Sequence, residues 1–245
     1  MSQPDIIYGL RAILETIESG KEIDKILIQK GLSGALFKDF FIKVRANKIP
    51  FQYVPIEKIN KITRGNHQGV VAFLSSIEYQ SIFDILPTIY EAGRVPFLLI
   101  LDKITDVRNI GAIARSAECA GVDAIILPLK GGALLNEDAV KTSAGALHKI
   151  PICRHPNLIE VIHFIQNSGV EVIAVTEKAK KNYFEKKLTE PLCFIVGNEY
   201  EGIAYDYLKI CNDAIQIPMM GTIASLNVSV ATGILLFETV KQRFY

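Results

Sequence analysis

The chain of 245 residues has few cysteines and no long apolar run. Its four cysteines stand at positions 119, 153, 193 and 211 without any Cys-x-x-Cys pair, which argues against a zinc site and a disulfide framework. This scatter fits the reduced thiols of a cytosolic protein. No apolar run reaches the ~18 residues that a membrane-spanning helix needs. The N-terminal residues also lack the basic and apolar regions of a secretory signal. We therefore expect a cytoplasmic protein without a membrane segment.

The sequence motifs of several common enzyme classes are missing. No Gly-x-Gly-x-x-Gly follows a predicted strand, so a Rossmann dinucleotide site is not supported, and the P-loop motif is absent. The Gly-x-Ser-x-Gly turn of the α/β-hydrolases is absent as well. The histidines, at positions 67, 148, 155 and 163, do not have metal-ligand spacing with carboxylates. We accordingly predict no metal site, and a nucleotide-dependent oxidoreductase is only a distant alternative.

Charge is nearly balanced over the whole chain but not along it. The formal net charge is +1, which by itself does not indicate a nucleic-acid-binding protein. Residues 1–75 carry a net charge of +4, and residues 76–245 carry −3. This asymmetry weakly assigns contact with a polyanion to the N-terminal part, and a solvated lysine-rich surface is the alternative reading.

Hydrophobic periodicity predicts a small α/β domain at residues 1–75. A polar stretch and a helix over residues 82–92 follow it, so residues 76–94 are predicted to be a linker with a connecting helix. The helices predicted in the N-terminal domain cover residues 8–19, 34–46 and 56–62, and its predicted strands cover 25–28, 51–54 and 70–74.

Strands and helices alternate over residues 95–245. Phe97 to Leu101 is a continuous apolar run, which is typical of a strand buried on both faces. The alternation predicts an α/β domain with a mainly parallel sheet and helices on both faces. Its predicted strands cover residues 97–101, 124–127, 170–175, 192–196 and 214–217, and its predicted helices 109–119, 136–142, 157–167, 204–210 and 225–243.

The loop that follows the first of these strands carries two notable polar residues. Asn109 stands at the start of the next predicted helix, where it is a candidate N-cap. Arg115 lies off the apolar stripe of that helix. It is either an ordinary surface arginine or a group whose guanidinium holds a phosphate.

Two further loops follow later strands. Residues 197–202 form a loop bracketed by glycines, whose backbone can approach a ligand closely. Within it, Glu199 is either a solvated carboxylate or a partner that orients an arginine. The loop at residues 217–227 ends in Ser225, a candidate N-cap, and Asn227, a candidate first-turn residue. Loops at the carboxyl ends of parallel strands converge at one edge of a sheet, so the three together predict one ligand site.

Taken in order, the three loops resemble the three motifs of the SpoU/TrmH family of RNA ribose 2′-O-methyltransferases, within the SPOUT superfamily. The matching segments are Asn109 to Arg115 with the following Ser-Ala, Ile195 to Glu199 with Gly202, and Ile217-Pro-Met with Ser225 to Ala231.

The N-terminal part takes part in the resemblance. Tyr8-Gly9 and His67-Gln-Gly69 are similar to the small substrate-binding domain of the branch that methylates a guanosine in bacterial 23S ribosomal RNA. Essentially the whole chain is therefore covered. Two departures are slight: Val107 stands where proline is common, and Asn198 stands where a small residue is usual.

The resemblance implies a fold that periodicity does not predict. The C-terminal domain, residues 95–245, would contain a deep trefoil knot, bind S-adenosylmethionine in it and form a homodimer through it. Arg115 would act on the ribose 2′-hydroxyl, Asn109 and Glu199 would orient the arginine, and Ser225 and Asn227 would shape the catalytic pocket. The implied cofactor-binding residues are Thr176, Val196, Gly197, Asn198, Ile217, Met219 and Leu226. No metal is required, because the sulfonium already activates the methyl group.

The resemblance also implies RNA as the partner of the chain. The candidates for RNA contact are Arg64, Asn66 and His67, which lie in a basic turn, and Arg108. The predicted reaction is methylation of a ribose 2′-hydroxyl, with a guanosine of 23S rRNA as the expected target. One alternative is the same chemistry on tRNA. Another is a catalytically silent RNA-binding or ribosome-assembly protein, against which the intact set of candidate catalytic residues speaks.

Overall fold

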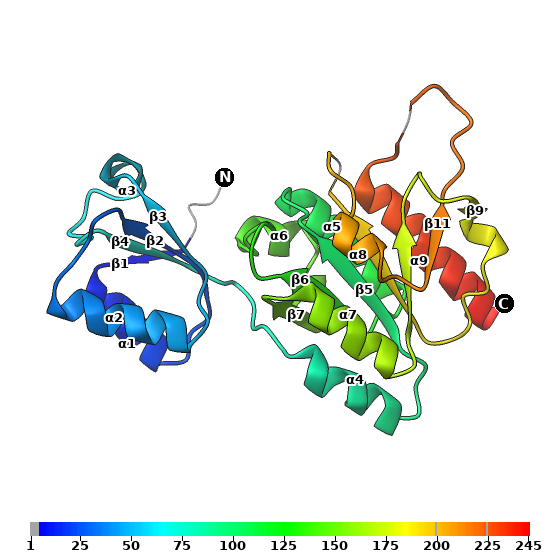
Figure 1. Ribbon diagram of the computed structural model, residues 1–245, viewed down its shortest axis with the longest axis horizontal. Coiled ribbons are helices and arrows are strands. Elements are labelled where there is room, and N and C mark those ends of the chain that lie inside the picture. Colours follow the sequence, from blue (N-terminus) through cyan, green and yellow to red (C-terminus); the bar gives the residue numbers. More distant parts are fainter. Residues whose placement is uncertain (1–4, 199, 224) are drawn as a thin grey trace. The chain divides into compact units, whose positions relative to one another are not determined.

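The computed structural model describes residues 5–198, 200–223 and 225–245 of the chain (Figure 1). The chain divides into two compact units. One contains the residues up to Glu78 together with Leu134–Glu137, and the other contains Tyr79–Ala133 and Asp138–Tyr245. Each unit has its own sheet and its own hydrophobic core.

The N-terminal unit is a four-stranded mixed sheet with helices. Its elements are β1 (Ile6–Tyr8), α1 (Leu10–Glu18), β2 (Ile23–Gln29), α2 (Ala35–Ala46), β3 (Phe51–Val54), α3 (Ile56–Ile62) and β4 (Val70–Leu74). The strand order is β1-β4-β2-β3, with β4 antiparallel to both neighbours and β2 parallel to β3. One core cluster joins α1 and α2 to the sheet through Ile13, Phe40 and Val44. Strand β1 was not predicted, because three residues are too few to show an alternating pattern.

The C-terminal unit is built on a seven-stranded parallel sheet of order β7-β6-β5-β10-β8-β11-β9, which confirms the predicted fold class. Its strands are β5 (Phe97–Asp102), β6 (Ala124–Pro128), β7 (Ile152–His155), β8 (Glu171–Val175), β9 (Lys181–Asn182), β10 (Leu192–Gly197) and β11 (Asp213–Gln216). Its helices are α4 (Ile82–Glu91), α5 (Val107–Cys119), α6 (Glu137–Thr142), α7 (Leu158–Asn167), α8 (Tyr205–Leu208) and α9 (Val228–Phe244). Strands β7 and β9 were not predicted, since each is short and partly polar.

The central strands β5 and β10 are buried along their whole apolar length, as the continuous apolar runs predict. On one face of the sheet, Leu98 and Ile100 belong to a cluster that includes residues of α4 and α7. Helices α5 and α9 pack against one another, and Ser116 Oγ lies 3.9 Å from the position that a Cβ on Gly233 would take. The small residues at this crossing let the two helix backbones approach closely.

Two helices begin at residues other than those predicted. Helix α5 begins at Val107 because Asp106 is its N-cap and accepts a hydrogen bond from the Arg108 amide. Asn109 therefore lies in the first turn and is not a cap. Helix α9 begins at Val228, with Asn227 as its N-cap. The prediction that Ser225 caps this helix is wrong, because the side chain that accepts from the first-turn amides is two residues later.

The end of α9 is anchored by Arg243 to backbone carbonyls of two separate segments. Its guanidinium donates to Leu188, Val95, Pro96 and Glu190, at distances from 2.8 to 3.3 Å. A planar guanidinium has five N–H donors and can serve all four carbonyls, whereas a lysine has only three donors. The last turn of the chain is therefore fixed against the segments that enter β5 and β10.

Candidate active site

The candidate site lies at the edge of the C-terminal sheet where β5, β8, β10 and β11 end. These strands are parallel, so their carboxyl ends reach the same edge. Gly197, the last residue of β10, is paired with Asp102, the last residue of β5. The loops before α5, after β10 and before α9 all start or end here. In open α/β sheets this edge is the usual place for a ligand.

The first and third loops are joined by a hydrogen bond between two asparagines. Asn227 Nδ2 donates to Asn109 Oδ1 over 3.1 Å. The other half of the Asn227 amide is occupied as the helix cap, since its Oδ1 accepts from the Ser229 and Val230 amides. Because the oxygen is committed to the cap, the NH₂ group must point to Asn109. The structure thus brings together two predicted site residues that are 118 positions apart.

Arg115 is exposed on α5, off the buried stripe formed by Ile110, Ile113 and Ala114. Within the part of the chain that the structure describes, no hydrogen bond or ion pair holds its guanidinium. Its predicted partner Glu199 lies outside the described residues. Ser225, the fifth candidate catalytic residue, is exposed in the third loop and is not linked by a hydrogen bond to the asparagine pair. An arginine held by no described group has its donors available for an anionic ligand.

The loop after β10 is a tight turn that only glycine can begin. A Cβ on Gly197 would lie 2.1 Å from the carbonyl carbon of Gly202 and 2.3 Å from the Ile203 nitrogen, both backbone atoms. The Gly202 amide donates to the Asn198 carbonyl over 2.8 Å and closes the turn. Val196, just before the turn, is buried in β10. Glycine is thus needed at position 197 because the chain folds back against it.

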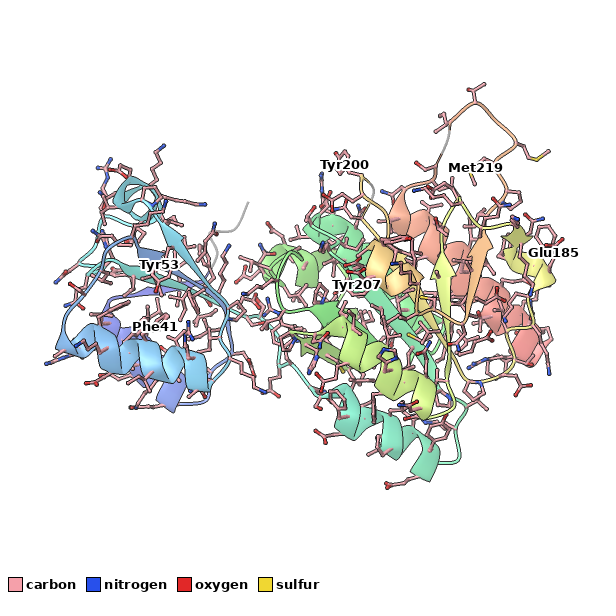
Figure 2. All side chains as sticks on the ribbon, in the orientation of Figure 1. Phe41, Tyr53, Glu185, Tyr200, Tyr207 and Met219 are labelled. Carbon is pink, nitrogen blue, oxygen red and sulfur yellow. The ribbon has the colours of Figure 1, made fainter. Side chains whose placement is uncertain are left out.

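Asn198 links this turn to the end of β5. Its Nδ2 donates to the Lys103 carbonyl over 3.1 Å, and its Oδ1 accepts from the Tyr200 amide over 2.8 Å. The asparagine that departs from the family motif therefore has a structural task, because both halves of its amide are used within the protein. Figure 2 shows Tyr200 at the outer tip of this loop.

The loop between β11 and α9 extends outward from the sheet in Figure 1. It exposes apolar side chains: Met220 is 97% exposed, Ile223 77% and Leu226 38%. Ile217 and Met219 are partly buried in the same loop. At the end of β8, Thr176 Oγ1 accepts from the Lys178 amide over 3.3 Å and shapes a turn. Exposed apolar side chains beside backbone groups form a surface that a flat apolar ring can cover.

Two residues of this edge were missed by the sequence analysis. Asp102 is 1% exposed, and its Oδ2 accepts a hydrogen bond from the Ala204 amide over 2.8 Å. Burial raises the pKa of its carboxyl group. Lys103 has a φ of 54°, a left-handed conformation that is unusual for a lysine. The sequence signal was a carboxylate at the end of an otherwise apolar strand, which gives no hint of its partner 102 residues away.

In the N-terminal unit, the predicted RNA-binding turn is held by its own histidine. His67 Nδ1 accepts from the Gly69 amide over 3.0 Å, so Nε2 carries the proton and donates to Asn60 Oδ1 over 2.9 Å. Both ring nitrogens are thereby occupied. Arg64 and Asn66 are exposed in the same turn. His67 therefore shapes the turn, whereas the side chains of Arg64 and Asn66 are exposed to solvent.

Arg108, the fourth candidate for RNA contact, is paired with a carboxylate. Its Nε and Nη2 donate to the two oxygens of Asp106 over 3.2 and 3.1 Å. These hydrogen bonds hold the pKa of Asp106 below its usual range. The pair is exposed, so a phosphate group can compete with Asp106 for the guanidinium.

The described residues contain no cluster of three His, Cys, Asp or Glu side chains that could hold a metal ion. None of the described helices combines the length and the apolar character needed to cross a membrane. All four cysteines are free thiols, and burial raises the pKa of Cys153 to about 12.

Two family models match the chain. Residues 96–237 match the model described as the SpoU rRNA methylase family, and residues 6–80 match the model described as RNA 2′-O ribose methyltransferase substrate binding. The two matches cover the C-terminal sheet with the candidate site and the N-terminal sheet, respectively.

Individual relatives match along nearly the whole chain. A 23S rRNA (guanosine-2′-O-)-methyltransferase RlmB of Yersinia pestis is 34% identical over 242 residues, which is 98% of each chain. A putative TrmH family tRNA/rRNA methyltransferase YacO of Bacillus subtilis is 30% identical over 241 residues, 98% of this chain and 97% of the relative. The solved structure of an AdoMet-bound rRNA methyltransferase from Sinorhizobium meliloti has a TM-score of 0.62 and 26% identity, covering 99% of this chain and 89% of the other.

Proposed function

The chain belongs to the SpoU rRNA methylase family, and from this premise we propose that it methylates the ribose 2′-hydroxyl of a guanosine in 23S rRNA. It is an RNA 2′-O-ribose methyltransferase, and its family membership implies the predicted trefoil knot. The observation that carries the proposal is the hydrogen bond between Asn109 and Asn227, which joins two of the family motifs at the edge where three loops meet. The finer assignment to a guanosine of 23S rRNA is supported by the 34% identity to the RlmB relative.

The residues at this edge fit S-adenosylmethionine as the methyl donor. The tight turn at Gly197 and the exposed apolar side chains of the third loop offer backbone groups and apolar contacts, which an adenosine needs. The proposed contacts are Thr176, Val196, Gly197, Asn198, Ile217, Met219 and Leu226. Asn198 contributes through the shape of the turn, since its own amide is already used.

When bound, S-adenosylmethionine supplies a methyl group on a positively charged sulfur, so no metal is needed to activate it. The protein's task is to place the ribose oxygen in line with that methyl group. Formation of the oxygen–carbon bond would break the sulfur–carbon bond, release S-adenosylhomocysteine and pass the hydroxyl proton to a base or to solvent water. The Asn109–Asn227 pair fixes the start of α9 against the start of α5. Ser225 and Glu199 are the remaining proposed members of the pocket.

Arg115 is proposed to act on the 2′-hydroxyl, either as a base or as an electrostatic group. A guanidinium has a pKa above about 12 and ordinarily keeps its proton. A cationic Arg115 would instead stabilise the developing negative charge on the ribose oxygen and hold the adjacent phosphate. We favour the second role, because Arg115 is exposed and held by no described group, so its donors are available to a phosphate and to the ribose oxygen.

Residues 1–75 are proposed to bind the RNA substrate, residues 76–94 to connect the domains, and residues 95–245 to carry the reaction. The substrate-binding family match and the net charge of +4 on residues 1–75 support this division. Arg64 and Asn66 are proposed to contact RNA directly, and His67 to hold their turn in shape. Arg108 would add a phosphate contact near the reaction.

Two substitutions should shift RNA affinity in opposite directions. Arg64→Ala should weaken binding of a 23S rRNA fragment and lower the slope of log affinity against log salt by about 0.7, the value of one phosphate contact in a single strand. Asp106→Asn should tighten binding two- to threefold and steepen the slope, because asparagine still caps α5 while Arg108 is freed. Both are measured by fluorescence anisotropy over a salt series. A slope that stays constant in both variants would contradict the assignment.

We further propose a homodimer formed through the C-terminal domain. Helix α9 exposes Val230 (51%), Phe237 (49%) and Phe244 (73%), which are spaced seven residues apart and so share one helix face. An exposed apolar stripe of this kind marks an interaction surface. Sedimentation velocity should give about twice the chain mass of 27.2 kDa for the wild type and a monomer for Phe237→Glu. A monomeric wild type at micromolar concentration would refute the dimer.

Two other functions share the fold. The B. subtilis relative is named a putative tRNA/rRNA methyltransferase, so methylation of tRNA is the nearest alternative. A silent RNA-binding protein is the other. Mapping ribose methylation across rRNA and tRNA in cells that lack the protein separates the three: we expect one 23S guanosine to lose its methyl group. Loss in tRNA alone would favour the first alternative, and no loss anywhere would favour the second. The proposed site of action is the cytoplasm.

A further inference from the structure

Asp102 is a buried carboxyl group that the proposed chemistry does not use. It ends β5 opposite Gly197 and is 1% exposed. Its Oδ2 accepts from the Ala204 amide over 2.8 Å. Its Oδ1 is also buried, and no group among the described residues forms a hydrogen bond with it. A buried polar atom without a partner is uncommon in a folded protein, so its presence here needs a physical explanation.

Asp102 and the residue after it hold both ends of the loop that follows β10. Asn198 Nδ2, at the start of the loop, donates to the Lys103 carbonyl over 3.1 Å. The Ala204 amide, just past the loop, donates to the Asp102 side chain. Lys103 keeps a left-handed φ of 54°, a conformation that is unfavourable for a residue with a Cβ. The end of β5 therefore holds both ends of the Gly197–Gly202 loop in place through these two hydrogen bonds.

The surroundings of Asp102 separate it from the candidate catalytic groups. Leu98 and Ile100 alternate with Asp102 along β5 and face the cluster that includes α4 and α7. Asn109 and Asn227 belong instead to α5 and the start of α9. Ala204, which donates to Asp102, is the N-cap of α8, so the carboxyl group lies at the start of that helix. The Asp102 side chain is therefore connected by its hydrogen bond to the end of the loop after β10 and not to the asparagine pair.

We infer that Asp102 is a positioning residue for cofactor binding, which holds the Gly197–Gly202 loop through the Ala204 amide in the shape that receives S-adenosylmethionine. The inference rests on the proposed function, because it takes this loop as a wall of the cofactor site. Loss of the carboxyl group should release one end of the loop and weaken cofactor binding, while the rest of the sheet edge keeps its structure.

Asp123 provides a matched control at the opposite edge of the same sheet. It precedes β6, is 8% exposed, and its pKa is also raised by burial. Its Oδ2 accepts a hydrogen bond from the Phe97 amide over 2.9 Å. The two aspartates therefore share burial and one backbone N–H donor each. They differ in position, because Asp123 lies where β5 begins and Asp102 lies where it ends. They also differ at the second oxygen, since Asp123 Oδ1 is paired with the Arg94 guanidinium and Asp102 Oδ1 has no described partner.

The test is calorimetric titration of S-adenosylmethionine into the full-length protein, with thermal unfolding recorded for each variant. Asp102→Ala should raise the dissociation constant about tenfold, since a hydrogen bond to a buried carboxyl group is lost. Asp102→Asn keeps an acceptor for Ala204 and should stay within about threefold of wild type. Asp123→Ala should lower the melting temperature at least as much as Asp102→Ala, because it also loses the ion pair with Arg94, but it should leave the dissociation constant unchanged. Equal cofactor affinity in the two alanine variants would overturn the inference.

A substitution at Ala204, the donor of the hydrogen bond, tests the inference even if the Asp102 variants misfold. Ala204 has a φ of −55°, which proline can adopt, and proline removes the donating N–H. Ala204→Pro should weaken cofactor binding as Asp102→Ala does, and the double variant should be no weaker than either. Additive losses would overturn the inference. Failure of the wild type to bind S-adenosylmethionine would instead refute the proposed function, so the two failures are distinguishable.

Discussion

Replacing Arg115 with alanine is expected to lower the rate of methyl transfer to RNA by about two to three orders of magnitude, the usual loss when one group that stabilises developing charge is removed. Cofactor affinity and the melting temperature should change little, because Arg115 is exposed and no described residue is held by it. Single-turnover transfer of a labelled methyl group to a 23S rRNA fragment measures the rate, and calorimetry measures cofactor binding.

Arg115→Lys distinguishes the geometry of the side chain from its charge. A lysine keeps the positive charge but loses the planar fork that binds a phosphate and an oxygen together. We therefore expect most of the loss to remain in this variant, and near-full activity would exclude any role that needs guanidinium geometry. Lys187→Ala is the control, because it removes an exposed cation, paired with Glu190, from the segment that enters β10. It should leave the rate unchanged.

Gly197→Ala is expected to weaken cofactor binding at least tenfold. The added Cβ would lie within 2.3 Å of three backbone atoms of Gly202 and Ile203, so no side-chain rotation can relieve the overlap. Overpacking of this kind costs about 1–3 kcal/mol of stability, and here the strain falls on the loop that faces the proposed site. We expect a lower melting temperature together with a dissociation constant for S-adenosylmethionine raised at least tenfold.

Gly221→Ala supplies the comparison within the same site. Nothing lies within 4 Å of the position of its Cβ, and its φ is outside the left-handed region. This variant should bind the cofactor and unfold as the wild type does. If both alanine variants bind equally well, the loop after β10 is not a wall of the cofactor site. If both lose binding, the effect of Gly197→Ala is not due to the overlap with Gly202.

Much of the fold could be predicted from local patterns. The continuous apolar run at Phe97 to Leu101 predicted a strand buried on both faces, and the alternation of elements predicted a parallel sheet. Strands β1 and β9 escaped prediction because two or three residues carry no period. The helix starts were misplaced because a cap depends on which side chain reaches the first-turn amides. Asp106 and Asn227 do so, and Asn109 and Ser225 do not.

The sequence predicted that three loops form the candidate site, but it did not predict the hydrogen bonds that connect them. The motif residues Asn109 and Asn227 could be named from sequence, but the direction of the Asn227 amide follows from its use as a cap. His67 was predicted to contact RNA, and the structure shows one ring nitrogen bonded to Gly69 within the turn and the other bonded to Asn60 of α3. That His67 also contacts RNA stays a prediction.

By itself, the sequence determined the class of fold, the edge of the sheet that carries the loops, and the family. These could be predicted because apolar periodicity and short motifs are local patterns that can be recognised in the sequence alone. The tertiary structure alone decided which polar groups hold those loops. Asp102 meets Ala204 across 102 positions, and Asn109 meets Asn227 across 118. Such contacts arise only after parallel strands have aligned their carboxyl ends, so no window of sequence contains both partners of either bond.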